Sequence, residues 1–90
     1  MIIRRHMYIK GDVQGVGFRY RTNYAAQSLG LTGYVRNLYD GRVELEVQGE
    51  RELISRMLGQ IDAGSFIHID EIETKDMEVD PDERSFRVVH

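Results

Sequence analysis

The chain has 90 residues, a formal net charge of −3 and no cysteine. Its length allows one hydrophobic core, so we expect a single domain over residues 1–90, and the acidic balance disfavours a general nucleic-acid binder, which would present a basic face. Without cysteine there are no disulfides, zinc–cysteine sites or cysteine nucleophiles. No apolar run approaches membrane-spanning length, so we expect a cytoplasmic protein that binds no membrane.

The segment from Ile3 to Ile9 alternates in polarity and predicts a first strand. Three glycines follow within the run Gly11 to Arg19, where they let the backbone bend and bring N–H groups close to a ligand. The helix that then begins at Phe18 has no side chain before it that would cap its N-terminus, and Arg19 in its first turn opposes the helix dipole. A bound anion, most simply a phosphate, would resolve both problems. The alternative is a glycine turn that binds nothing, and the Rossmann and P-loop patterns are both absent.

The remaining elements follow from periodicity and turn residues. Apolar spacing predicts a helix from Phe18 to Leu29 and a second from Glu50 to Ile61. Strands are predicted over Leu31–Asn37, Val43–Val47, Phe66–Val79 and Ser85–Val89, with a hairpin turn at Tyr39-Asp40-Gly41. Within the long strand, Ile67 and Ile69 have one parity and Ile72 the other, which predicts a bulge or bend.

The order β-α-β-β-α-β predicts an α+β fold of the ferredoxin-like kind, an α/β sandwich with two helices packed on one face of an antiparallel sheet. In this arrangement the first two strands run parallel, with the third between them. The glycine loop after the first strand and Asn37 at the end of the second therefore lie close together, on the side of the sheet where both strands end.

Two segments resemble the signatures of the acylphosphatase family. Ile9 to Arg19 (IKGDVQGVGFR) is similar to the first signature at every restricted position. Gly33 to Asn37 (GYVRN), followed by Gly41, Val43 and Gly49, is similar to the second. The strand and helix pattern extends the likeness over essentially the whole chain. One departure is the segment from Ala63 to His68, which lacks the proline turn often found there in the family and leaves the packing of the last long strand open.

The resemblance implies a function and roles for individual residues. The family hydrolyses carboxyl–phosphate anhydrides, small acyl phosphates, to a carboxylate and inorganic phosphate, with no metal and no organic cofactor. Arg19 matches the arginine that binds the phosphate, and Asn37 matches the asparagine that orients the attacking water. We expect a monomeric enzyme. The backbone cradle for the phosphate oxygens matches Gln14, Gly15, Val16, Gly17 and Phe18.

Taken alone, Arg19 is more commonly a surface cation, and Asn37 is equally consistent with a residue that only ends a strand. Placed together beside the glycine loop, the two favour a functional site. Thr22 is expected to bond either the loop or its own helix backbone. Other side chains suggest no chemistry. The histidines lack metal-ligand spacing. Three side chains at or near the hairpin could border the pocket but are more simply expected in solvent, and three glutamates are expected to form an acidic outer strand face. These three groups are His6, His68 and His90; Arg36, Tyr39 and Arg42; and Glu44, Glu46 and Glu50.

Two other functions stay open on the sequence. A domain of this fold can serve as a non-catalytic module that senses phosphate or docks on a larger enzyme. A related sheet binds RNA, but it requires aromatic residues on a central strand, where this chain has Val43 to Val47 (VELEV).

Overall fold

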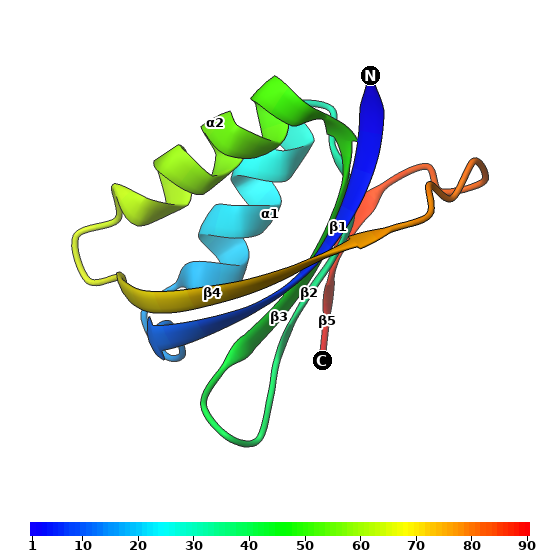
Figure 1. The fold of residues 1–90 in the computed structure, drawn as a ribbon. Coiled ribbons are helices and arrows are strands. Elements are labelled where there is room, and N and C mark those ends of the chain that lie inside the picture. The colour runs from blue at the N-terminus through cyan, green and yellow to red at the C-terminus, as the bar shows by residue number, and fades with distance from the viewer.

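The computed structural model describes residues 1–90, and its two helices lie on one side of a five-stranded sheet (Figure 1). The elements in chain order are β1 (Ile2–Asp12), α1 (Phe18–Ser28), β2 (Thr32–Asn37), β3 (Val43–Glu50), α2 (Arg51–Asp62), β4 (His68–Met77) and β5 (Phe86–Val89). Every predicted element is present, and the boundaries differ from the predicted ones by a few residues at most. None of the helices is long and apolar enough to cross a membrane.

The hydrophobic core lies between the helices and the sheet. The alternation in β3 buries Val43, Leu45 and Val47 completely against the helices. On α2 the apolar stripe buries Ile54, Met57 and Ile61. On α1 the buried residues are Phe18, Thr22, Ala25 and Ala26. Small alanines on α1 let this helix approach the sheet closely, and its N-terminus is thereby held at a fixed place relative to the strand ends.

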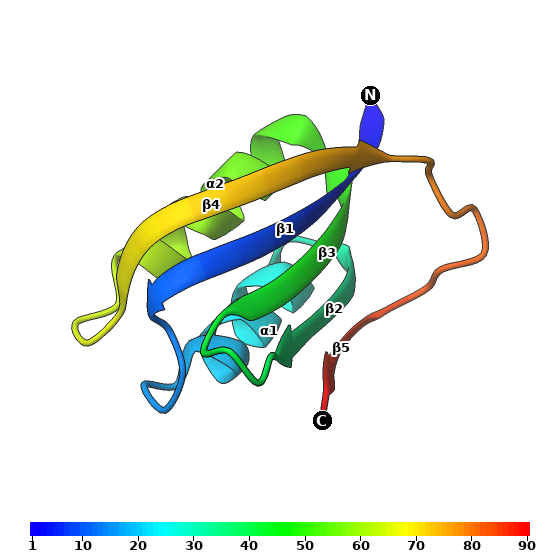
Figure 2. The ribbon, with the colours of Figure 1, turned by 60° about the horizontal axis from the view of Figure 1, so that its bottom comes forward.

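The strands follow the order β4-β1-β3-β2-β5 (Figure 2). β3 pairs antiparallel with both β1 and β2, so β1 and β2 run in the same direction, as predicted. β5 pairs parallel with β2, which adds one parallel pair at the edge of an otherwise antiparallel sheet. The cause is the connection between β4 and β5, which crosses from one edge of the sheet to the other and reverses the chain on the way.

The bulge predicted from the parity of the isoleucines is confirmed. Lys10 is paired with Glu71, whereas the next residue of β1, Gly11, is paired with Ile69. Asp70 is therefore the extra residue on β4, and it changes which face the following side chains occupy. Strand pairing continues on both sides of the bulge, so the unusual 63–68 segment does not disturb the packing of β4.

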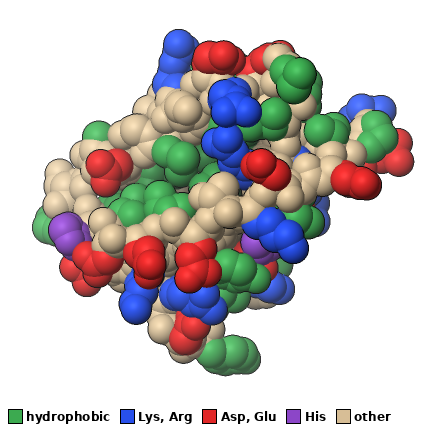
Figure 3. All heavy atoms as spheres, viewed as in Figure 1, with side chains coloured by type: hydrophobic (Ala, Val, Ile, Leu, Met, Phe, Trp, Pro, Cys, Tyr) green, Lys and Arg blue, Asp and Glu red, His purple; other side chains and the backbone are tan.

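β4 is an edge strand, and acidic side chains gather along it (Figure 3). Its exposed carboxylates belong to Asp70, Glu71, Glu73 and Asp76. Charge on an edge strand discourages pairing with a second chain through the unpaired backbone groups.

Candidate functional site

A pocket of about 240 Å³ opens beside the N-terminus of α1, at the end of the sheet where β1 and β2 finish. It joins the glycine loop, the first turn of the helix and the end of β2, because the parallel directions of β1 and β2 bring both strand ends to this end of the sheet. The two side chains selected from the sequence, Arg19 and Asn37, both line it. Its lining comprises Val13, Gly15, Gly17, Phe18, Arg19, Tyr20 and Asn37.

The loop that forms the floor of this pocket leaves its backbone donors unused. Gly15 and Gly17 adopt left-handed conformations, with φ values of 74° and 78°, which only glycine adopts readily. Gly17 caps α1, and no side chain caps the helix, as predicted. The first N–H of the helix with a backbone partner is that of Arg21, 3.0 Å from the Gly17 carbonyl oxygen, and no loop or cap hydrogen bond uses an N–H of residues 14–20. These donors and the positive end of the helix dipole suit an anion.

Arg19 brings an uncompensated positive charge to the pocket. It is half-buried in the first turn of α1, and it forms no ion pair with any carboxylate side chain. Its Nη1 lies 3.3 Å from Nδ1 of His90. This neighbour was not predicted from the sequence, because it depends on the parallel pairing of β5 with β2. That pairing places residue 90 near the end of β2, where Asn37 lies.

Asn37, the last residue of β2, contributes a buried acceptor. Its Oδ1 has no hydrogen-bond partner in the protein. An unsatisfied buried acceptor costs free energy unless a ligand or a water molecule donates to it. Thr22 Oγ1 is also buried without a partner, so both expected roles for Thr22 are wrong. Its side chain is fully buried instead.

Known proteins share this chain's sequence and fold. The acylphosphatase family model matches residues 5–88. An acylphosphatase of Geobacillus thermodenitrificans is 40% identical over 88 residues, which cover 97% of this chain and 94% of that protein. The crystal structure of acylphosphatase from Bacillus subtilis superposes with a TM-score of 0.88 at 28% identity and covers all of both chains. This chain belongs to the acylphosphatase family.

Family membership makes the chain a hydrolase that acts on acyl phosphates, as the sequence motifs implied. The same fold also occurs inside a much longer protein. Full-length HypF, in a phosphate- and nucleotide-bound crystal structure, contains a region with a TM-score of 0.84 and 33% identity, and this chain covers 12% of that protein.

In this member of the family the side chain of Gln14 ties the loop to the β2–β3 hairpin. Its Nε2 donates to the carbonyl oxygens of Leu38, at 2.7 Å, and Arg42, at 2.9 Å. The sequence suggested only a backbone role for Gln14. The two bonds fix the glycine loop relative to the strand end that carries Asn37, so Gln14 acts as a positioning residue.

We expect Gln14→Met to destabilise the protein by about 2 kcal/mol, because two hydrogen bonds are lost, although the two carbonyl oxygens keep their backbone donors, the N–H groups of Gly41 and Leu38. Urea unfolding measures this difference. Gln27→Met is the matched control, since Gln27 is exposed and its Nε2 only contacts Asn23 on the same helix. Equal stability of the two variants would contradict a positioning role for Gln14.

The histidines lie apart from the pocket or at its margin, and no group of three or more His, Asp or Glu side chains is arranged to hold a metal ion. His6 and His68 lie on neighbouring strands but at different ends of the pairing, opposite Lys75 and Asp12. His68 contacts Asp70 on the surface.

Of the hairpin residues, Arg36 pairs with Glu44, and Arg42 pairs with Asp40 and lies over the Tyr8 ring.

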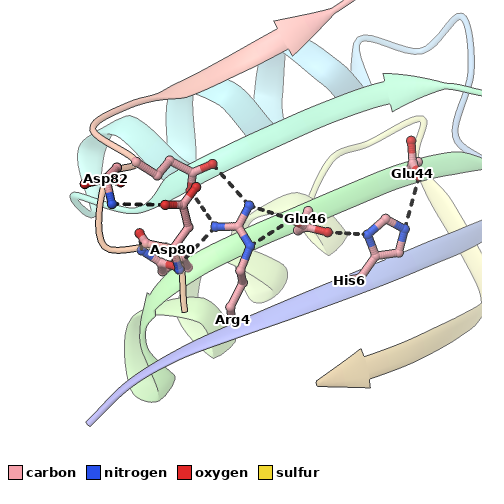
Figure 4. A network of polar contacts seen from close by, with 8 residues as sticks. Arg4, His6, Glu44, Glu46, Asp80 and Asp82 are labelled. Carbon is pink, nitrogen blue, oxygen red and sulfur yellow. Dashed lines mark hydrogen bonds and ion pairs between the residues drawn. The ribbon is translucent and has the colours of Figure 1, made fainter. Parts of the chain in front are cut away.

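A second polar cluster covers the face of the sheet opposite the helices (Figure 4). Arg4 pairs with Glu46 at 2.5 Å and with Glu83 at 2.7 Å, and all three side chains are largely buried. His6 lies between Glu44 and Glu46, at 3.1 Å and 2.6 Å. Glu44 and Glu46 thus occupy the outer face of β3, as predicted, but their charges are neutralised by neighbours and their side chains are largely buried, whereas Glu50 is partly exposed and pairs with the N-terminus of Met1. The sequence pattern shows which face a residue occupies, not what covers it.

The cluster shifts the protonation of its members. Hydrogen bonds to Glu83 and Glu46 raise the pKa of Arg4, although its burial opposes this. Burial would raise the pKa of Glu46, but hydrogen bonds from His6 and Arg4 outweigh burial and lower it. Burial, with the charges of Glu44 and Glu46, raises the pKa of Tyr34. This charge cluster lies on the face of the sheet opposite the core, and none of its members lines the pocket that contains Arg19 and Asn37.

Proposed function

We propose that the chain hydrolyses acyl phosphates by in-line attack of a water molecule that Asn37 orients on a phosphoryl group held by Arg19 and the loop of residues 14–18. The observation that carries this proposal is the convergence of three unused groups on one pocket. They are the backbone N–H groups of the loop, a guanidinium with no carboxylate partner, and the buried Oδ1 of Asn37.

Phosphoryl transfer requires mainly positioning and stabilisation of charge on the equatorial oxygens. The guanidinium of Arg19 is a planar fork that can hold two of these oxygens together. The loop N–H groups can donate to the others, and the α1 dipole adds a positive end there. Each charge-assisted hydrogen bond contributes about 1.5–3 kcal/mol. Because the donors are fixed before substrate arrives, little reorganisation is needed during the reaction.

The role of Asn37 follows from its chemistry. A carboxamide is too weak a base to take a proton, but its Oδ1 can accept a hydrogen bond from a water molecule and aim the water at phosphorus. A bond forms between the water oxygen and phosphorus while the bond from phosphorus to the acyl oxygen breaks. The carboxylate leaves with the electron pair, and a phosphate oxygen of the substrate accepts the proton of the water.

The proposed reaction uses no metal ion and no organic cofactor. A carboxylate is already a stable anion, so the leaving group does not need protonation by a general acid. The charge stabilisation that a cation would supply comes from Arg19 and the loop donors. We also propose that a single chain is the active form, because one copy supplies every group of the pocket, and that it acts in the cytoplasm. Sedimentation at working concentration tests the oligomeric state.

Hydrolysis of acetyl phosphate with excess EDTA tests the proposal. We expect turnover by the wild type and a fall of about a hundredfold in kcat for Asn37→Ala, because a misdirected water reacts slowly. Asn23→Ala is the matched control, since Asn23 lies on α1 and lines no part of the pocket. A folded Asn37→Ala variant with full turnover would remove the water-orienting role.

The same assay separates an enzyme from a phosphate-sensing module. A module predicts that inorganic phosphate binds and that acetyl phosphate is stable. An RNA-binding sheet is disfavoured, because the outer side chains of β3 are carboxylates engaged by Arg4, His6 and Arg36 and not aromatic rings.

A further inference from the structure

Two exposed tyrosines lie beside the pocket, on different elements. Tyr20 belongs to the first turn of α1, is 69% exposed and lines the pocket together with Arg19. Tyr39 follows β2 in the hairpin and is fully exposed. It lines an adjoining hollow of about 330 Å³ with Gln14, Asn37 and Leu38. An exposed aromatic ring beside a pocket offers a flat apolar surface to a ligand, and both tyrosines are placed to contact a substrate.

The in-line geometry of the proposed reaction distinguishes between the two. Attacking water and leaving group lie on opposite sides of phosphorus. Asn37 forms the wall of the pocket that comes from β2, and the adjoining hollow with Tyr39 opens on that same wall. The attacking water occupies the Asn37 side, so the acyl group cannot leave toward Tyr39. Of the two exposed tyrosines, only Tyr20 on α1 is then placed to contact the acyl group.

We infer that Tyr20 forms the acyl subsite and makes aromatic acyl phosphates better substrates than small aliphatic ones. The inference rests on the proposed function. The exposed ring of Tyr20 supplies a flat apolar surface beside the guanidinium that holds the phosphate. An aromatic acyl group can stack on this ring, whereas an acetyl group is too small to cover it. The adjoining hollow beside Tyr39 is then the route by which water reaches Asn37.

The test compares benzoyl phosphate with acetyl phosphate for the wild type, Tyr20→Ala, Tyr20→Phe and Tyr39→Ala. We expect Tyr20→Ala to lower the ratio of kcat/KM for benzoyl phosphate to kcat/KM for acetyl phosphate about two- to tenfold. Tyr20→Phe should retain the wild-type ratio, because the ring and not the hydroxyl makes the contact. Tyr39→Ala, also an exposed tyrosine beside the pocket, should leave the ratio unchanged.

The outcomes separate this inference from the function on which it rests. If the wild type hydrolyses acetyl phosphate but Tyr20→Ala leaves the ratio of the two substrates unchanged, the acyl subsite is wrong and the proposed function stands. The same conclusion holds if Tyr39→Ala, and not Tyr20→Ala, changes the ratio. If the wild type hydrolyses neither substrate, both proposals fail.

Discussion

Replacement of Arg19 by alanine is expected to lower kcat/KM for acetyl phosphate about a thousandfold, the scale on which an arginine stabilises the transferring phosphoryl group in other enzymes. The guanidinium has no carboxylate to neutralise it, so its charge is available to the substrate. Its contact with His90 is long and exposed, so little of the fold depends on it. The variant should therefore stay folded while losing activity.

Two comparison variants make this expectation specific. Arg19→Lys keeps the charge but not the planar fork, so it should recover only part of the activity. Arg56→Ala removes an exposed arginine of α2 that lines no part of the pocket and should be indistinguishable from the wild type. Inorganic phosphate should raise the melting temperature of the wild type and not of Arg19→Ala, since a ligand stabilises the state that binds it. A folded Arg19→Ala with wild-type kcat/KM would exclude Arg19 from the site.

Local sequence patterns were sufficient to predict the sheet and helix order, because each pattern acts within one element. The alternation in β3 determines which face is buried, and the parity change between Ile69 and Ile72 predicted a bulge or bend, which the strand pairing places at Asp70. The parallel pairing of β5 was not predictable in this way. It depends on where the 78–85 connection carries the chain, and nothing in the four residues of β5 specifies a partner strand.

The part of the candidate site that could be predicted from the sequence is the part whose position follows from the order of the strands and helices. The glycine loop and Asn37 meet because β1 and β2 are parallel, and that follows from the element order. Contacts made by side chains across the fold were not foreseen. Gln14 reaches carbonyl oxygens more than twenty residues away, and His90 reaches Arg19 through the end of β5. Thr22 reads as a polar helix residue but lies fully buried without a partner.

Arg4 shows the same limit on the outer face of the sheet. In the sequence it is one of several charged residues near the N-terminus, but in the fold it is only 7% exposed. Its guanidinium binds Glu46 on β3 and Glu83 from the connection before β5, and Gln48 also accepts a bond from it (Figure 4). Arg4 therefore links the connection that crosses the sheet to the central strand.

Arg4→Met is expected to lower the free energy of unfolding at pH 7 by about 3 kcal/mol, because it leaves the buried carboxylate of Glu83 without its cation and leaves Glu46 with only His6 as a partner. Urea unfolding measures the loss. Arg5→Met is the matched control, since Arg5 pairs only with the exposed carboxylate of Asp76, at 3.4 Å, and such surface pairs contribute at most about 1 kcal/mol. Adding Glu46→Gln and Glu83→Gln to Arg4→Met should restore part of the stability, because the unpaired buried charges are removed.

The loss of stability in Arg4→Met is expected to depend on pH. The pKa of Glu46 in the folded protein lies below its ordinary value of 4.5. Its ionised form therefore stabilises the fold fully above pH 4.5, and this contribution is lost as the pH falls through the folded-state pKa. In Arg4→Met, Glu46 loses the hydrogen bond and the positive charge of Arg4 that help to lower its pKa, so this pKa rises and protonation of Glu46 relieves part of the penalty in acid. The difference between wild type and variant should be largest near neutral pH and shrink below pH 4.5. A difference that stays constant from pH 7 to pH 3 would mean that Arg4 acts through the packing of its stem and not through charge.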